Sequence, residues 1–254
     1  MVWERILRLC QGAVNLVTAV ALLLCSGFGA YALWDNGQVL ASAADVQAQL
    51  LLWKPEPAAP ETEAPDNGEA FVRLRQINPD VRGWITMEGT GIDFPVLQGS
   101  NNLTYISRDV FGNFSLAGSI FLDSRDDGNF DQSYALLYGH HMADGKMFGD
   151  LDRYKEDAFF RENPAGQLIL PGKVWQLETV ACLVVGAAEK WIFDPDYVRQ
   201  DMAGFLRFVR ENALHLGQLP EEGGKYLVLS TCSGEFTDAR TVVITRMYEV
   251  GQEA

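Results

Sequence analysis

The segment 226–240, "YLVLSTCSGEFTDAR", brings a thiol and a guanidinium close together in the sequence. Its apolar first half is typical of a buried strand that ends at Cys232, and Arg240 opens a second β-like run after a short polar loop. A hairpin of these two runs would return the guanidinium to the side of the thiol. A cysteine thiolate is a strong nucleophile, and a fixed cation can stabilise the oxyanion formed when it attacks a carbonyl.

Two of the three histidines stand together in the segment 134–148, "YALLYGHHMADGKMF". His140 and His141 follow a short apolar run, with Gly139 as a hinge, and functional groups are commonly placed at the ends of rigid elements. A histidine can donate a proton to a leaving amine, so the thiol, imidazole and guanidinium would form a set suited to acyl transfer. The chain shows no obvious Asn or Asp partner of the papain kind, and the arginine would take over that electrostatic role. His215 falls at the end of a predicted polar helix, where we expect it to be solvated.

Each of these residues also has a structural interpretation. Cys232 could be a buried core thiol, or it could form a disulfide with Cys182 in an oxidising compartment. Arg240 could form a surface ion pair with Asp238 or Glu235, which would contribute little stability. The cysteines and histidines show no CxxC or HxxxH spacing, which argues against a structural zinc site. We expect neither a metal nor a cofactor.

The N-terminal part of the chain predicts a membrane anchor. Residues 9–34 carry no charge, and a helix that crosses the hydrocarbon core needs about 20 mostly apolar residues. Because Arg5 and Arg8 precede this stretch, we place the tail of residues 1–8 in the cytoplasm and the rest of the protein outside the cell membrane. The alternative is a cleaved signal peptide, since "ASA" at 41–43 resembles a cleavage site, but signal peptides have apolar cores of about 7–15 residues.

Residues 35–69 are expected to connect this anchor to a folded domain. The run 39–52 has helix-forming composition. The segment 54–69, "KPEPAAPETEAPDNGE", combines prolines with several acids, as in an extended, semi-rigid spacer. A domain of residues 70–254 follows.

This domain has the pattern of a mainly β fold. A short amphipathic helix is predicted over 70–78, and helical patterns recur at 147–154 and 201–216. Eight β-like runs separated by Gly, Asn and Asp are predicted at 83–88, 92–98, 119–124, 134–140, 166–172, 173–187, 225–232 and 241–250. With few helices and no βαβ alternation, these runs favour a closed barrel or a sandwich.

The overall charge narrows the range of partners. The net charge is −14, and we find no concentrated basic patch. Such a field repels polyphosphate, so we expect no nucleic-acid partner.

Three stretches resemble class B sortases and occur in that family's order: 77–127, 134–154 and 227–240. The resemblance covers about residues 71–250 and rests on the Leu-Ser-Thr-Cys strand, the Gly-His-x-Met segment and the downstream arginine. It implies a sortase-type closed β-barrel of about eight strands, with N-terminal helices and one long helix late in the chain, behind a single transmembrane helix.

The resemblance also implies roles for particular residues. Cys232 takes the place of the nucleophile, His140 that of the catalytic histidine and Arg240 that of the family's arginine. His141 stands where the family often has Asn. Because a disulfide would abolish the thiolate, Cys182 is then expected to be a core thiol.

Three further positions match residues that bind substrate in the family. Ser230 and Thr231 are expected to line the site, and Asn102 matches a substrate-contacting Asn. One departure is Asn101, where the family pattern leads us to expect Asp.

What the resemblance implies as activity is a membrane-anchored cysteine transpeptidase of a Gram-positive-type cell surface. Such enzymes cut a sorting signal near the C-terminus of a secreted protein, hold the acyl group as a thioester and pass it to an amine. The amine belongs to a lipid-linked peptidoglycan precursor or to a pilin lysine. Two alternatives are a hydrolytic cell-surface cysteine peptidase and a membrane-tethered β-barrel binding module without chemistry.

Overall fold

The computed structural model describes residues 2–58 and 65–249. Residues 59–64 of the expected spacer lie outside the described residues, and so does Val250 at the end of the last predicted strand. The chain divides into two compact units, Met1–Ser42 and Ala43–Ala254.

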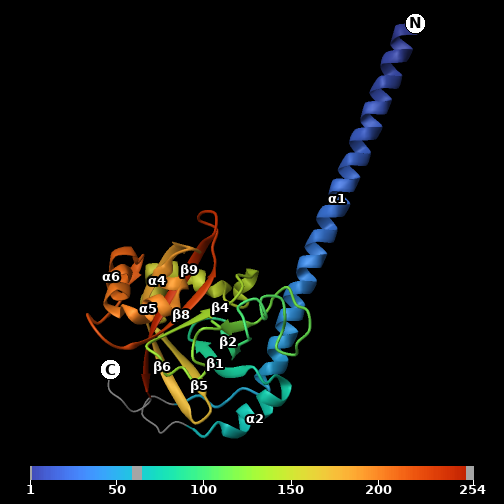
Figure 1. Ribbon diagram of the computed structural model, residues 1–254. Helices are drawn as coiled ribbons and strands as arrows, with labels where there is room; N and C mark the ends of the chain where they lie inside the picture. Colours follow the sequence, from blue (N-terminus) through green and yellow to red (C-terminus); the bar gives the residue numbers. More distant parts are fainter. Residues whose placement is uncertain (1, 59–64, 250–254) are drawn as a thin grey trace. The chain divides into compact units, whose positions relative to one another are not determined.

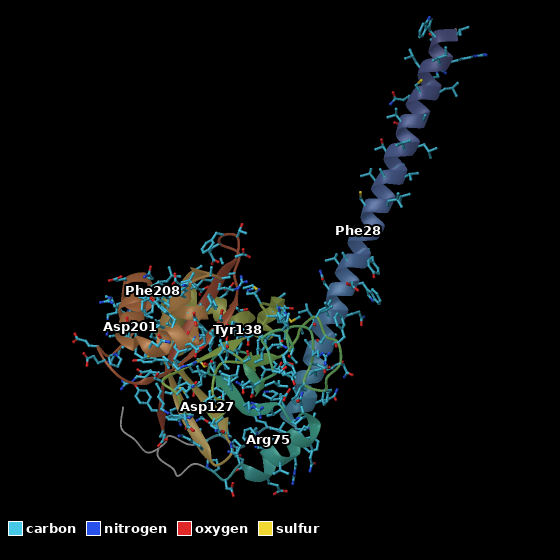
Figure 2. All side chains as sticks on the ribbon, in the orientation of Figure 1. Phe28, Arg75, Asp127, Tyr138, Asp201 and Phe208 are labelled. Atoms are coloured by element: carbon cyan, nitrogen blue, oxygen red, sulfur yellow. The ribbon has the colours of Figure 1, made fainter. Side chains whose placement is uncertain are left out.

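The first unit belongs to a single long helix, α1 (Val2–Leu51) (Figure 1). Its apolar stretch is long enough and apolar enough to cross a membrane, and none of that stretch is buried. The side chains project outward around the helix, as Figure 2 shows near Phe28. The helix predicted separately over 39–52 is the continuation of α1, because no proline interrupts the backbone before Pro55.

The second unit begins with the last turns of α1. Ala43 and Leu50 are buried in its core. The described start of the expected spacer lies against the same unit, since the backbone of Ala58 exchanges two hydrogen bonds with the side chain of Gln167, at 3.2 and 2.6 Å. This part of the chain is therefore held by the folded unit rather than extended away from it.

Eight strands form a closed barrel, and each corresponds to one of the predicted β-like runs. They are β1 (Val81–Met87), β2 (Asp93–Leu97), β3 (Ile120–Leu122), β4 (Tyr134–Tyr138), β5 (Ala165–Leu170), β6 (Lys173–Gly186), β8 (Lys225–Cys232) and β9 (Ala239–Glu249). Their order is β5-β1-β2-β3-β4-β8-β9-β6, and the pairing of β5 with β6 closes the circle. The prediction of a mainly β fold with a closed barrel is confirmed.

Two of the pairings are parallel, β2 with β3 and β4 with β8, and the others are antiparallel. Parallel neighbours need a long connection. The connection between β4 and β8 contains most of the helices, and the one between β2 and β3 is the long loop over residues 98–119. The parallel β4–β8 pair brings two segments far apart in the sequence to one edge of the barrel.

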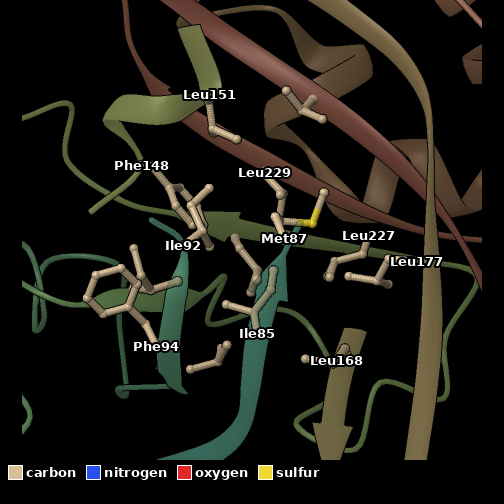
Figure 3. Close-up of a cluster of buried hydrophobic side chains, with 14 of the residues drawn as sticks. Ile85, Met87, Ile92, Phe94, Phe148, Leu151, Leu168, Leu177, Leu227 and Leu229 are labelled. Carbon is tan, nitrogen blue, oxygen red and sulfur yellow. The ribbon is translucent and has the colours of Figure 1, made fainter. Parts of the chain in front are cut away.

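The barrel interior is filled by aliphatic and aromatic side chains. Leu227 and Leu229 of β8 point into this cluster together with Ile85 of β1 (Figure 3). The residues between them face the other way, since side chains alternate along a strand. Tyr226 and Val228 accordingly pack in a second cluster outside the barrel, against α6 (Met202–Asn212).

The remaining helices are short and lie around the barrel. They are α2 (Gly68–Ile77), the 3₁₀ helices η1 (Ala143–Gly145) and η2 (Gly149–Lys155), α3 (Asp157–Glu162), α4 (Lys190–Phe193) and α5 (Pro195–Gln200). The helix predicted over 201–216 is wrong in its last turn. There the chain forms β7 (His215–Leu216) on the edge of β6, because the backbone N–H of Leu214 bonds the carbonyl of Cys182 instead of continuing the helix.

Candidate active site

The β8–β9 hairpin places a thiol and a guanidinium side by side. Cys232 and Arg240 are directly opposite each other in the antiparallel register. Directly paired residues project from the same face of a sheet. Leu227 and Leu229 face the barrel interior, so strand alternation directs Cys232 to the outer face. The predicted hairpin geometry is confirmed.

The imidazole of His140 reaches the same edge from β4. Tyr138 pairs with Ser230 in the parallel β4–β8 register, and the N–H of Gly139 donates to the Ser230 carbonyl at 3.1 Å. Two residues further along each chain stand His140 and Cys232. The parallel pairing therefore aligns the histidine with the cysteine.

Local packing holds the His140 ring in a defined orientation. Its Nε2 lies 2.7 Å from the carbonyl oxygen of Ile106, in the β2–β3 loop. Because a carbonyl can only accept, Nε2 is the donor and Nδ1 is left as the nitrogen able to exchange a proton. A Cβ at Gly139 would lie 2.5 Å from Cδ1 of Ile120 and 2.7 Å from the Phe148 ring, so only glycine fits before the histidine.

These three groups line one pocket with a volume of about 140 Å³. Its wall has an apolar part and a polar part, made by Ile106, Phe121, Tyr138, Gly139, His140, Ser230, Thr231, Cys232 and Arg240. The hydroxyls of Ser230 and Thr231 are buried without a hydrogen-bond partner among the described residues.

Asn102 does not line this pocket. Its Nδ2 donates to the Asp123 carboxylate at 2.8 Å, and its Oδ1 accepts the backbone N–H of Ser124 at 2.7 Å. Asp123 is fully buried and also accepts from Arg125 and, at 2.9 Å, from the hydroxyl of Tyr138. Because Tyr138 is a pocket residue, Asn102 supports the pocket wall from behind through Asp123.

The Asp123 carboxylate is ionised in spite of its burial. Burial raises the pKa of Asp123, but the hydrogen bonds from Arg125 and Tyr138 outweigh it and hold that pKa below its ordinary value. This charged cluster behind the pocket was missed by sequence reasoning. The only signal for it in the sequence is the acidic run over residues 123–131, which follows β3.

The two cysteines of the second unit are free and differ in environment. Cys182 is fully buried in the barrel core, and burial raises the pKa of its thiol to about 12. Cys232 is exposed. The alternative of a Cys182–Cys232 disulfide is therefore wrong, and the expected core thiol at Cys182 is confirmed.

The alternative ion pairs of Arg240 are also absent. Glu235 binds Lys155 at 2.5 Å, and Arg240 donates through Nη1 to the neighbouring Ala239 carbonyl at 2.9 Å. Arg240 has no carboxylate partner within the described ranges. Its charge is therefore not neutralised by an acid at the pocket.

The other two histidines lie outside the pocket. The Nε2 of His141 lies 2.9 Å from the Asp152 carboxylate. His215 was expected at a solvated helix end, and this is wrong: it begins β7, is half-buried and donates through Nε2 to the Lys155 carbonyl at 2.7 Å. Within residues 2–58 and 65–249, no three His, Cys, Asp or Glu side chains are grouped to hold a metal.

The chemistry open to this pocket follows from its contents. An exposed thiol beside an imidazole and an unneutralised guanidinium can attack a carbonyl, stabilise the resulting oxyanion and return a proton to the leaving group. A closed eight-stranded barrel with these groups at the ends of β4, β8 and the start of β9 is the arrangement that the resemblance to thiol-dependent sortases implies.

Comparison with known proteins identifies the family. Sortase B of Listeria monocytogenes is 30% identical over 173 residues, which are 66% of this chain and 70% of the relative. Among solved structures, a class B sortase of Streptococcus pyogenes involved in pilus biogenesis is 33% identical, with a TM-score of 0.64 over 70% of this chain and 97% of that one. Clostridium perfringens sortase B is 32% identical, with a TM-score of 0.63 over 70% and 99%.

A scan against protein-family models finds no match. The similarity to the Listeria and Streptococcus sortases, in sequence and in structure, nevertheless establishes the family. This chain belongs to the class B sortases, a family of cysteine transpeptidases.

Proposed function

We propose that this protein cleaves a C-terminal sorting signal of secreted proteins and transfers the acyl group to an amine. One observation carries the proposal: Cys232, His140 and Arg240 line a single pocket, brought there by the β4–β8 and β8–β9 registers. The acceptor is the amine of a lipid-linked peptidoglycan precursor or of a pilin lysine. The pilin lysine stays in the proposal because one structural relative is a sortase involved in pilus biogenesis.

In the first half-reaction the Cys232 thiol passes its proton to Nδ1 of His140, and the resulting thiolate attacks the scissile carbonyl. The S–C bond forms as the carbonyl π electrons move to oxygen. Arg240 faces the same pocket and stabilises that oxyanion. His140 donates a proton from Nδ1 to the leaving nitrogen, since the Ile106 carbonyl occupies Nε2. The C–N bond breaks and a thioester remains on Cys232.

In the second half-reaction an amine attacks the thioester carbonyl. His140 accepts the proton that the amine loses, and the C–S bond breaks to free the thiolate. The product is a new amide, so the bond energy of the original peptide is conserved through the thioester.

Ser230 and Thr231 supply the substrate-binding part of the proposal. Both residues line the pocket, and Ser230 shares the outer face of β8 with Cys232. Its buried hydroxyl has no partner among the described residues, and a peptide backbone offers groups that could bond it. Asn102 contributes indirectly, through Asp123 and Tyr138, rather than by touching the peptide.

The arrangement in the cell is part of the same proposal. Residues 9–34 of α1 anchor the protein in the cell membrane in a single pass, with residues 1–8 in the cytoplasm because Arg5 and Arg8 precede the span. Residues 35–69 connect to an extracellular catalytic domain of residues 70–254.

The test uses the full chain in detergent with a library of peptides carrying candidate sorting signals and an added amine nucleophile. We expect mass spectrometry to detect an amide-linked product that disappears in Cys232→Ala and His140→Ala. If only the carboxylic acid product forms at every amine concentration, the protein is a hydrolytic peptidase and not a transpeptidase. If no product of either kind forms and the Cys232 thiol resists alkylation at neutral pH, the protein is a binding module without catalytic activity.

A further inference from the structure

A second polar cluster lies next to the pocket in sequence and shares none of its lining residues. We call it the Asp152 cluster: Asp152 and Lys155 of η2, His141, Ser233, Glu235 and Thr241. Three of its members directly follow the three proposed catalytic residues in the sequence: His141 follows His140, Ser233 follows Cys232 and Thr241 follows Arg240. Arg240 and Thr241 are neighbours in β9, so strand alternation turns Thr241 to the opposite face from Arg240.

The Asp152 carboxylate joins these segments through hydrogen bonds on both of its oxygens. Oδ2 lies 2.9 Å from Nε2 of His141, and Oδ1 accepts the Thr241 hydroxyl at 2.6 Å. The Thr241 hydroxyl in turn lies 3.2 Å from the hydroxyl of Ser233. One carboxylate therefore connects the segments that follow β4 and β8 with the start of β9.

Two kinds of contact fix the Asp152 cluster in place: burial of η2 side chains in the barrel core, and a pair of salt bridges made by Lys155. Leu151 and Tyr154, on either side of Asp152 in η2, are fully buried in the barrel core. Lys155 binds Asp152 at 2.9 Å and Glu235 at 2.5 Å, which ties the β8–β9 loop to the same helix. Glu235 also accepts a hydrogen bond from Ser233.

Asp152 is charged under ordinary conditions. Its partial burial raises the pKa of Asp152, but hydrogen bonds from Thr241 and Lys155 more than compensate and hold that pKa below its usual value. A hydrogen bond to an ionised group is stronger than one between neutral groups. The Asp152 carboxylate therefore holds the three segments together more strongly than a neutral side chain of the same shape would.

We infer that Asp152 is a positioning residue for the Cys232–His140–Arg240 site: it sets the relative placement of the three strand ends through the residues that follow each catalytic group. The inference rests on the proposed function. Catalytic groups must be held within a fraction of an ångström, and a displacement of about 1 Å can lower the rate about a hundredfold. Loosening this tie should lower turnover without changing the surface that binds the peptide.

The experiment compares Asp152→Asn with Asp150→Asn in the full chain. Asp150 is the matched control because it also lies in η2 and also ties it to the barrel, accepting the Gly91 N–H at 2.7 Å, but makes no contact with the cluster. For Asp152→Asn we expect kcat to fall about ten- to hundredfold with KM within about twofold of the parent. For Asp150→Asn we expect both within about twofold.

Thr241→Val and Thr241→Ser provide a second pair should the first variant fail to fold. The valine removes the hydroxyl that binds Asp152 and should lower kcat, whereas the serine retains that hydroxyl and should restore it. A kcat of Asp152→Asn within about twofold of the parent, or an equal fall in Asp150→Asn, overturns the inference.

The inference can also fail separately from the proposed function. If the parent protein forms no amide product, the proposed function fails, and the rate of Cys232 alkylation becomes the measure of Asp152. A rate that changes severalfold in Asp152→Asn and stays constant in Asp150→Asn supports the positioning role, and equal rates in both contradict it.

Discussion

Replacing Asn102 with alanine separates a supporting role from direct contact with substrate. The substitution removes the hydrogen bond to the buried Asp123 carboxylate and the acceptor for the Ser124 N–H. A hydrogen bond to a charged group is worth about 1.5–3 kcal/mol and a neutral one about 1 kcal/mol. Because Asp123 is fully buried, we expect the free energy of unfolding to fall by about 2–4 kcal/mol.

The assay is urea unfolding of the full chain in mild detergent, followed by tryptophan fluorescence, together with steady-state cleavage of a sorting-signal peptide. The control is Asn101→Ala, since the exposed Asn101 accepts only within its own turn, from the Leu103 N–H at 2.9 Å and the Thr104 hydroxyl at 3.3 Å. Its effect on stability should stay below about 1 kcal/mol.

For the folded Asn102→Ala enzyme we expect KM for the peptide to remain within about twofold, because the Asn102 side chain is turned to Asp123 and not to the pocket. The reasoning would be refuted by the reverse result. That result is a loss of stability under about 0.5 kcal/mol with a severalfold rise in KM, as expected of a residue that touches the peptide.

Three other predictions address the pocket and the thiols. Arg240→Lys should lower kcat/KM about a hundredfold or more, because an ammonium does not reproduce the planar guanidinium; near-normal turnover would remove Arg240 from oxyanion stabilisation. Gly139→Ala should lower the free energy of unfolding by about 1–3 kcal/mol and also lower turnover, because the added Cβ would collide with Ile120 and shift His140. An active, equally stable variant would show that the backbone at this position can move to accept a side chain. A small alkylator at neutral pH should label Cys232 in the native protein and Cys182 only in denaturant, because Cys182 is buried and the pKa of its thiol is raised to about 12. Peptide mass mapping identifies the labelled cysteine, and labelling of Cys182 in the native protein would contradict the packing.

Much of the barrel is predictable because short alternating runs bounded by Gly, Asn and Asp have few other structures available. All eight runs are strands of the barrel. The β-like runs alone leave a barrel and a sandwich open. The pairing of β5 with β6 distinguishes the barrel from a sandwich. These strands follow each other in the sequence and stand at the two ends of the barrel's strand order, so their pairing closes the sheet.

The element ends are less predictable because they depend on partners distant in sequence. The helical pattern over 201–216 continues to Leu216, but a free edge of β6 offers the backbone of residues 214–217 a strand partner, and the helix stops at Asn212. The local pattern contains no information about that edge.

The strand pattern places Cys232, His140 and Arg240 at the ends or start of strands, and it leaves their structural interpretations open. The resemblance to class B sortases assigns their roles. The residues that support them carry no such signal. Asn102 meets Asp123, and Asp152 meets Thr241, only after the barrel closes. Asp152 stands in a 3₁₀ helix among other acids, so its link to the strand ends depends on tertiary structure alone.

The most direct test of the account is capture of the acyl group on the enzyme. The full chain is mixed with a sorting-signal peptide without an amine acceptor, quenched in acid and digested, and the peptides are weighed. We predict that the peptide containing Cys232 gains the mass of the acyl fragment, loses it on treatment with hydroxylamine, and gains nothing in His140→Ala. Product formation with no such adduct, or an adduct on another residue, would contradict the account.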